Sequence, residues 1–429
     1  MNMKKRILAG LALLLALPMF SQTTPEEVMA DLDKAGGVYY AYPVSESRNT
    51  PAPKGYKPFY ISHYGRHGSR YLISDEDYLK VARTLHSAEE AGALTPLGRD
   101  VMERVDSVLV EARGRGGDLS PLGVRQHRGI AERMYRAFPE VFAGEAPVSA
   151  RSTTVIRCVL SMDAFCERLK ELNPSLRTTR ESSARYMDYL NYHSPESNAY
   201  TGGDEWREEY RKFEKGHTNP DRLMASLFAD SDYVRRKVNP EELMWGLYWI
   251  AVGMQDIETE LSFYDIFTPQ EMFDLWQCGN YHFYVCDHNY PGNRGLVVGN
   301  ATNLLRNIIE SADEALAADK PSATLRFGHD GNLIPLSAIL RLENCYNSES
   351  NPEDFYKAFA TFRISPMAGN IQMVFFRPPG KNPMPEDYLV KFMLNERETS
   401  IPVETDSWPF YRWGDVRDFY VNLMLHDRK

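Results

Sequence analysis

The sequence predicts an α/β protein with a mostly parallel sheet, helices on both faces of that sheet, and an inserted, mainly helical domain. Strand-like stretches alternate with amphipathic helices in both halves of the chain, and such alternation favours a parallel sheet covered on both faces. From residue 177 to residue 293 strand signals disappear, while Tyr, Trp, Asn and Pro become frequent. We therefore expect an α/β core in 22–176 and 294–429, and a helical cap domain in 177–293.

The elements of the first half follow from apolar spacing and from capping residues. KPFYISHYG, residues 57–65, alternates apolar positions and predicts a strand, and residues 74–92 predict a helix. Two further helices begin at LTPLGRD and LSPLGVR, where Thr95 and Ser120 can cap and a proline takes the first helical position. Residues 146–169 predict a short strand, a loop and an amphipathic helix.

The strand–helix pattern resumes after the predicted insertion, whose most apolar helix is PEELMWGLYWIAVGMQDI. The later elements are a helix at 300–319, a strand and loop at 323–332, a helix at 333–343, and strands at 370–377 and 388–396. No linker is long enough or low enough in complexity to indicate independent domains.

The N-terminal stretch has the pattern of a secretory signal peptide over residues 1–21. Lys4, Lys5 and Arg6 form a positive region, and an apolar run follows as far as Phe20. A membrane anchor is the alternative, but the run is short for a span of about 20 residues. No cysteine lies near its end, which excludes a lipid anchor there. We expect an exported protein, periplasmic or extracellular, with no membrane span in the mature chain.

Charge and cysteine content exclude other classes of protein. The 429 residues carry a formal net charge of −10, so we expect no general affinity for nucleic acid, and any basic site must be local. The five cysteines are an odd number and none has CxxC spacing, so a zinc site is not expected. Buried free thiols are the simplest interpretation, and disulfides, which export would permit, are the alternative.

Three loops carry unusual polar residues. They are RHGSR at 66–70, the loop that contains Arg151, and HDGN at 329–332. Each follows a predicted strand and precedes a helix, and ligands of parallel sheets bind at the carboxyl ends of the strands. Arg66 and Arg70 flank His67, a spacing that is repulsive unless an anion lies among the three side chains. The loops together therefore predict a site for a tetrahedral dianion, because arginine donors fork and helix N-termini add free amides.

Each of these residues also has an ordinary structural interpretation. An arginine beside a glycine is usually solvated, and HDGN has the composition of a simple turn. His63 and His67 are four residues apart, as metal ligands can be, but the flanking arginines would repel a cation. We expect His63 to face the sheet, and we expect neither a metal nor a cofactor. The coincidence of three such loops favours a functional site over the ordinary interpretations.

The motifs RHGSR, RSTTVIR and GHDGNL occur in the order typical of the histidine phosphatase superfamily. LSPLGVRQHRGIAERM is similar to the helix that separates the first two motifs in that family. The chain resembles the clade of histidine acid phosphatases, phytases and multiple inositol polyphosphate phosphatases, over roughly residues 57 to 345. Three motifs in order are much more specific than any one of them.

The resemblance implies a role for each motif residue. His67 would be the nucleophile and become a phosphohistidine, and Asp330 would protonate the leaving alcohol. The residues that would bind the phosphoryl oxygens are Arg66, Arg70, Arg151 and His329. The chemistry agrees, since neutral imidazole is a competent nucleophile and arginines can stabilise phosphoryl transfer without a metal.

Three departures from the family pattern leave the substrate open. Leu72 stands where many relatives have proline, Gly331 stands where many phytases have threonine, and Asp330 replaces the Ala-Glu pair of animal inositol polyphosphate phosphatases. We expect a secreted phosphomonoesterase that acts on an inositol polyphosphate such as phytate. A broad-specificity sugar-phosphate or nucleotide phosphatase is one alternative, and an inactive phosphate-ester binding protein is another. A phosphoryl-transferring mutase is a third, which export argues against.

Overall fold

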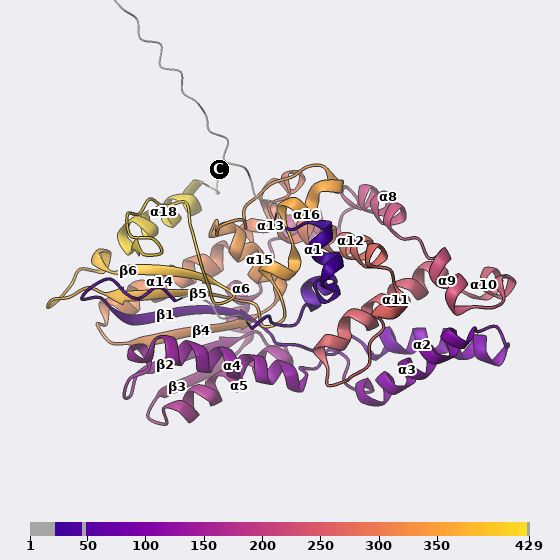
Figure 1. Ribbon diagram of the computed structural model, residues 1–429. Helices are drawn as coiled ribbons and strands as arrows, with labels where there is room; N and C mark the ends of the chain where they lie inside the picture. The colour runs from indigo at the N-terminus through magenta and orange to yellow at the C-terminus, as the bar shows by residue number, and fades with distance from the viewer. Residues whose placement is uncertain (1–21, 45–48, 427–429) are drawn as a thin grey trace, which may run out of the picture.

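The computed structural model describes residues 22–44 and 49–426 (Figure 1). The predicted signal peptide therefore lies outside the described residues. One eight-stranded sheet occupies one half of the molecule, with strands in the order β3-β2-β4-β1-β5-β6-β7 and β8 paired with β6. The strands are β1 (Lys57–Arg66), β2 (Pro147–Ser152), β3 (Arg177–Ser182), β4 (Ser322–Gly328), β5 (Asn370–Arg377), β6 (Leu389–Leu394), β7 (Arg397–Thr399) and β8 (Tyr411–Arg412).

The sheet is parallel where the predicted loops leave it. Strands β3, β2, β4 and β1 pair in parallel, and Arg66 at the end of β1 lies opposite Gly328 at the end of β4. The late strands β5 to β8 extend the sheet with antiparallel pairings. The predicted α/β class is confirmed, and the register brings the loops after β1 and β4 to one edge.

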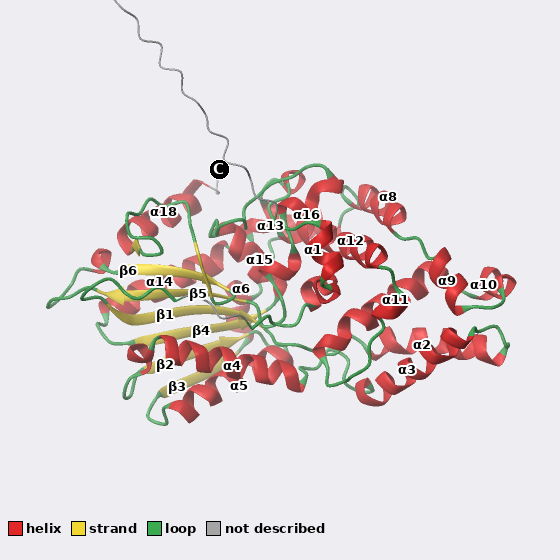
Figure 2. Ribbon diagram, in the orientation of Figure 1, coloured by secondary structure: helices red, strands yellow, loops and turns green. Residues whose placement is uncertain are grey.

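Helices cover both faces of the sheet (Figure 2). Helices α4 (Pro121–Ala137) and α5 (Ile156–Leu172) pack on one face, where Ile61 and Phe327 of the sheet meet Phe165 of α5. On the other face lie α14 (Thr302–Ala317), α15 (Asp330–Ile339) and α18 (Trp413–His426). The two faces follow from the period of two in β1, since Ile61 points to one core and Tyr60 and Tyr64 to the other.

A separate helical core fills the other half of the molecule, beyond the ends of the parallel strands (Figure 1). It contains side chains from α2 (Asp75–Glu90), α3 (Pro96–Ala112), α9 (Asp221–Leu227), α11 (Pro240–Gly253) and α12 (Pro269–Asp287). Helices α3 and α4 begin as predicted, because Thr95 and Ser120 accept hydrogen bonds from the amides of Gly98 and Gly123.

The predicted limits of the helical cap need a correction. Strand β3 lies inside the stretch 177–293 that was expected to be helical, yet it pairs in parallel with β2 as the edge of the sheet. Its sequence, RTTRES, is polar and largely exposed, so it has no apolar alternation for a sequence pattern to detect. In addition, α2 and α3, from the predicted core, pack in the helical half. The division into core and cap otherwise remains a prediction.

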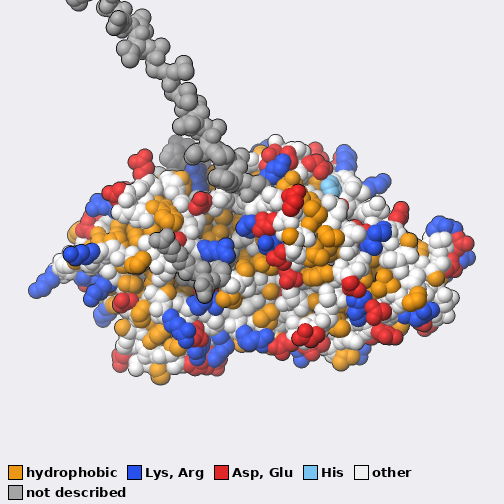
Figure 3. All heavy atoms as spheres, viewed as in Figure 1, with side chains coloured by type: hydrophobic (Ala, Val, Ile, Leu, Met, Phe, Trp, Pro, Cys, Tyr) orange, Lys and Arg blue, Asp and Glu red, His pale blue; other side chains and the backbone are white. Residues whose placement is uncertain are grey.

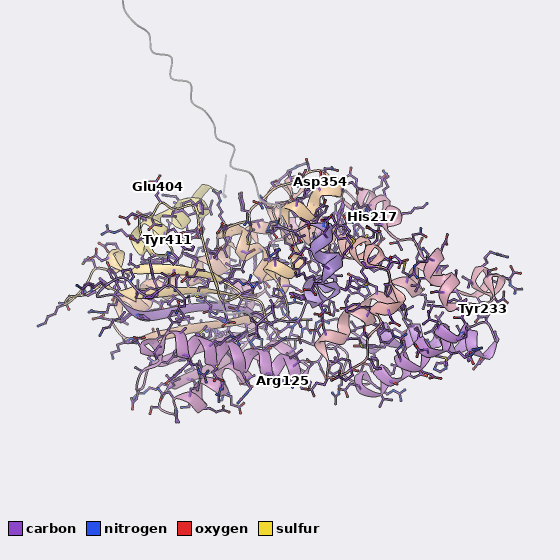
Figure 4. The ribbon with its side chains drawn as sticks, viewed as in Figure 1. Arg125, His217, Tyr233, Asp354, Glu404 and Tyr411 are labelled. Carbon is purple, nitrogen blue, oxygen red and sulfur yellow. The ribbon has the colours of Figure 1, made fainter. Side chains whose placement is uncertain are left out.

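The remaining helices are shorter or lie at the junction of the two halves. They are α1 (Pro25–Ala30), α6 (Met187–Leu190), α7 (Pro195–Gly202), α8 (Arg207–His217), α10 (Ser231–Lys237), α13 (Leu296–Gly299), α16 (Phe355–Ala358) and α17 (Thr361–Ile364). Arg125 of α4, labelled in Figure 4, lies between the two halves and forms an ion pair with Glu258 of the helical half.

The cysteines and the surface charges follow the expectations from composition. All five cysteines are buried and free, in agreement with the simplest interpretation of their number. Positive and negative side chains are interspersed on the face shown in Figure 3, without an extended basic patch. No helix in the described part of the chain is long and apolar enough to cross a membrane.

Candidate active site

The RHGSR loop is fixed where β1 ends. The His67 amide donates to the carbonyl of Gly328 at 3.0 Å, which joins the loop to the end of β4. Gly68 passes so close to α4 that a Cβ there would lie 2.6 Å from the carbonyl oxygen of Gly123. Only glycine fits at this position, and the contact holds the loop against the first turn of α4.

His67 is oriented and neutral. Its Nδ1 lies 2.9 Å from the carbonyl oxygen of Gly68, and because a carbonyl can only accept, Nδ1 carries the proton. Nε2 therefore keeps its lone pair. Burial lowers the pKa of His67 well below the ordinary value, and the charges of Arg66, Arg70 and Arg157 lower it further. A neutral imidazole with a free Nε2 is the form that a nucleophilic histidine needs.

Arg66 is fully buried and oriented by backbone oxygens. Its Nη1 donates to the carbonyl of Ser365 at 2.8 Å and also to the carbonyl of Val38. Its Nη2 lies 2.8 Å from Oδ2 of Asp330, and the buried Nε has no partner in the described part of the chain. The neutral carbonyls position the guanidinium without cancelling its charge.

Arg70 is held in a similar way by uncharged groups. Its Nη1 donates to the hydroxyl of Tyr39 at 3.0 Å and to the carbonyl of Tyr71 at 2.9 Å. The guanidinium also lies over the Tyr39 ring, 4.6 Å from its centre. The Nε atom of Arg70 is buried and has no hydrogen-bond partner within residues 22–44 and 49–426. Arg66 and Arg70 therefore keep both charge and free donors, as a site for an anion requires.

His329 and Asp330 lie beside His67, at the start of α15. The rings of His67 and His329 have their centres 5.8 Å apart, and Nε2 of His329 is 3.1 Å from Oγ1 of Thr153. Burial lowers the pKa of His329 to about 4 although Asp330 opposes the change, so this imidazole is also neutral. A neutral His329 can still offer one N–H to an oxygen atom.

Asp330 is ionised beside these cations. Burial alone would raise its pKa, but the charges of Arg66, His329 and Arg70 outweigh burial and hold the pKa below the ordinary value. Its side chain remains 23% exposed, and Oδ1 accepts a hydrogen bond from the amide of Gly331 at 2.9 Å. Asp330 is thus within reach of both the cations and the solvent.

The structure does not bring Arg151 to this group. Arg151 lies within β2 rather than in the loop after it, and its Nε pairs with Glu181 of β3 at 3.2 Å. Its Nη1 donates to the hydroxyl of Tyr189 at 3.2 Å, and its guanidinium covers the Tyr186 ring. These partners hold the Arg151 side chain within the sheet, against Glu181 of the edge strand β3 and the tyrosines that follow it.

Arg157 takes the place that was expected of Arg151. It lies in the first turn of α5, and its charge acts on His67, Arg70 and Asp330. Its Nε is buried and, like the Nε atoms of Arg66 and Arg70, finds no partner among the residues that the structure describes. The sequence signal was available, since Arg157 is the last residue of the RSTTVIR motif and lies one residue inside a predicted helix.

A buried network of hydrogen bonds joins the RHGSR loop to α4 and to the helical half of the molecule. Ser69 donates from its hydroxyl to Oδ1 of Asp256 at 2.6 Å, and its amide donates to Gln126 at 2.8 Å. Asp256 is fully buried in a 3₁₀ turn (Met254–Asp256) after α11, so the network joins the loop to the helical half. No sequence pattern indicated Asp256.

His63 faces the sheet core, as expected. Its ring lies 5.2 Å from that of Phe165 and 5.3 Å from that of Phe327, and burial lowers its pKa to about 3. Within residues 22–44 and 49–426, no group of three or more His, Cys, Asp or Glu side chains could hold a metal ion.

Comparisons with known proteins agree with this geometry. The family model described as histidine phosphatase superfamily (branch 2) matches residues 66–395. The structure is similar to multiple inositol polyphosphate phosphatase of Bifidobacterium longum in complex with inositol hexasulfate, with a TM-score of 0.73 and 17% identity over 92% of this chain and 98% of that chain. It is also similar to the phytase from D. castellii, with a TM-score of 0.68 and 18% identity over 95% of this chain and 88% of that chain.

At these identities the solved structures establish the fold, whereas the family rests on the sequence model. No curated protein matches the chain by sequence. The family model begins at Arg66 and includes the RSTTVIR and GHDGNL motifs, so it covers the residues that carry the predicted chemistry. The chain belongs to branch 2 of the histidine phosphatase superfamily and is a phosphomonoesterase.

Proposed function

We propose that this protein is an exported enzyme that removes phosphate from inositol polyphosphates such as phytate, through a phosphohistidine at His67. The observation that carries the proposal is the neutral His67, with a free Nε2, among three arginines whose buried Nε atoms have no partner among the described residues. Such a site attracts a phosphoryl dianion and offers it a nucleophile. We assign the phosphoryl oxygens to Arg66, Arg70, Arg157 and His329.

The first half of the proposed reaction transfers the phosphoryl group to the enzyme. Nε2 of His67 attacks phosphorus as the bond to the ester oxygen breaks, and Asp330 gives its proton to the departing alkoxide. The arginines stabilise the charge on the phosphoryl oxygens, which is the main contribution a protein makes to this reaction. In the second half, water attacks the phosphohistidine, Asp330 accepts the proton of that water, and His67 is released with inorganic phosphate.

Asp330 must gain a proton before it can act as an acid. The charge of Arg66 keeps the pKa of Asp330 low as long as no substrate is bound. A bound dianion brings two negative charges to the same place and competes for the donors of Arg66. Both effects raise the pKa of Asp330, so substrate binding favours the protonated form that the reaction needs.

The choice of substrate rests on similarity and chemistry together. The structurally similar B. longum protein is named as an inositol polyphosphate phosphatase and was solved with inositol hexasulfate, and the D. castellii protein is named as a phytase. A broad-specificity sugar-phosphate or nucleotide phosphatase remains the alternative. Export is proposed from the signal-peptide pattern in residues 1–21 alone.

Phosphate release from phytate, glucose 1-phosphate, AMP and p-nitrophenyl phosphate tests the proposal. The protein should prefer phytate, retain its activity after exhaustive EDTA treatment, and lose activity when His67 is replaced by alanine. A higher kcat/KM for AMP or glucose 1-phosphate would favour the alternative substrates. An active His67→Ala enzyme, or activity lost to EDTA and restored by a metal, would contradict the proposed chemistry.

A further inference from the structure

A second carboxyl group faces the start of α15 from the helical half of the molecule. Asp287 is the last residue of α12, and its Oδ1 lies 3.6 Å from the position that a Cβ on Gly331 would occupy. Apart from the two chain neighbours of Gly331 and the backbone of its own helix, no other atom of the described residues lies within 4 Å of that position. Asp330 is the first residue of α15 and Asp287 faces the next residue, Gly331, so both carboxyl groups lie at the first turn of this helix.

The two carboxyl groups have opposite surroundings. Asp330 contacts the guanidinium of Arg66 and accepts an amide hydrogen bond. Asp287 is half-buried, and within the described residues its side chain has neither a hydrogen bond nor an ion pair. A carboxyl group that is buried without a cation or a donor favours its neutral, protonated form.

The other groups around Asp287 do not favour its charged form either. From α15 only Asp330 acts on it, with a like charge. On its own helix, burial raises the pKa of the Cys286 thiol to about 12, and burial lowers the pKa of His288 to about 3, so both neighbours are neutral. The C-terminal end of α12 adds partial negative charge. The pKa of Asp287 is raised to about 7, mainly by burial and secondly by the negative charge of Asp330.

We propose that Asp287 shares one proton with Asp330 and supplies it when a phosphate ester binds. This inference rests on the proposed function. On binding, the proton passes from the Asp287 carboxyl through a water molecule to the Asp330 carboxylate, and it then passes to the alkoxide as the ester bond to phosphorus breaks. When water later attacks the phosphohistidine, the proton that this water releases returns to the two carboxyl groups and restores their shared proton. Asp287 acts through Asp330, so it is a positioning residue for the acid and not a catalytic residue.

A shared proton removes a difficulty in the proposed reaction. Asp330 alone, paired with Arg66, would be almost fully ionised in the free enzyme near neutral pH. General acids work best when their pKa lies near the working pH. Two interacting carboxyl groups lose their protons in two steps that belong to the pair. The pair therefore keeps one proton until the pH reaches the second of these two steps, which lies close to neutral pH.

The test is the pH dependence of kcat/KM for wild type, Asp287→Asn and Asp274→Asn. Asp274 is a second partly buried carboxyl group on α12, more than three helical turns from Asp287, and serves as the matched control. With phytate, Asp287→Asn should move the alkaline limb to lower pH by at least about one unit, and should cost about tenfold or more near pH 7 but little near pH 5. With p-nitrophenyl phosphate, whose leaving group needs no proton, both variants should match wild type.

A merely structural role would give a different result. If Asp287→Asn lowers kcat/KM by the same factor at every pH, or leaves the alkaline limb in place, the proposal is wrong. Infrared difference spectra of the free enzyme provide a readout without turnover: in an Asp256→Asn background, which removes the Asp256 carboxyl that titrates near pH 8, the enzyme should lose one protonated carboxyl band through about pH 7, and the Asp256→Asn, Asp287→Asn double variant should not. If that band titrates but no phosphate is released, the proposed function fails and the shared proton stands.

Discussion

Replacing Asp256 by asparagine should change how the stability of the protein depends on pH. Asp256 is fully buried; its Oδ1 accepts a hydrogen bond from the Ser69 hydroxyl, and its Oδ2 has no partner among the described residues. Burial raises its pKa from 3.8 to about 8, although the Ser69 hydrogen bond and the charges of Arg70 and Arg66 oppose this. The native carboxyl group is therefore protonated at neutral pH, whereas the unfolded one is ionised.

The size of the effect follows from that difference. Between about pH 4 and pH 8 the native state binds one more proton than the unfolded state, so the free energy of unfolding falls by about 1.4 kcal/mol per pH unit on account of Asp256. This stability is complete below the unfolded pKa and is lost as the pH rises through the folded pKa. Asparagine has no proton to lose. From pH 5 to pH 8, Asp256→Asn should therefore gain about 4 kcal/mol relative to wild type.

Urea unfolding at pH 5, 6, 7 and 8 measures this difference. Any loss of hydrogen bonding by the amide is constant with pH, so the slope of the difference is the informative quantity rather than its absolute value. The exposed Asp415 provides the control, because Asp415→Asn should follow wild type at every pH. Parallel curves for wild type and Asp256→Asn would refute the reasoning, since they would mean that Asp256 is ionised in the native state.

Three further predictions concern the site. Rapid quenching at high pH during turnover should trap labelled phosphate on His67, and an unlabelled protein at steady state would contradict the assignment. Arg157→Gln should reduce kcat/KM by about 10²–10³-fold, as expected for one stabilising donor, whereas Arg151→Gln should have little effect; the reverse order would restore the sequence-based assignment of Arg151. Asp330→Asn should slow phosphoenzyme formation by about 10²–10⁴-fold with phytate and only modestly with p-nitrophenyl phosphate in a pre-steady-state burst, and equal losses would mean that Asp330 serves a common step.

Sequence reasoning succeeded where the chemistry is local. The RHGSR loop and the HDGN loop each follow a strand directly, so the period of the strand and the glycines are enough to place them. Thr95 and Ser120 cap their helices for the same reason, because a cap depends on residues three positions apart. The strand pattern then brought His67 and Asp330 to one edge of the sheet.

Sequence reasoning failed where the position of a side chain depends on the exact start of a helix or on contacts with distant segments of the chain. Arg151 and Arg157 lie in one motif, but the strand extends through Ser152, which leaves Arg151 in the sheet and places Arg157 in the first turn of α5. The groups that orient Arg66, the carbonyls of Val38 and Ser365, are 28 and 299 residues away along the chain. No local pattern carries such contacts, and the same is true of Asp256 and Asp287.

The crowding of Arg66 and Arg70 around His67 is explained by the contacts of Arg66. Under the proposed function, Asp330 occupies Nη2 of Arg66 until a phosphate oxygen replaces it, so the buried guanidinium always has an anion beside it. When a phosphate oxygen replaces it, the Asp330 carboxylate loses its contact with Arg66 and lies beside a dianion. Both changes favour protonation of Asp330. Binding of the substrate and activation of the acid are then one event. A fold that kept Arg66 paired to a fixed carboxylate would bind phosphate less well and would lack the acid at the moment of bond cleavage.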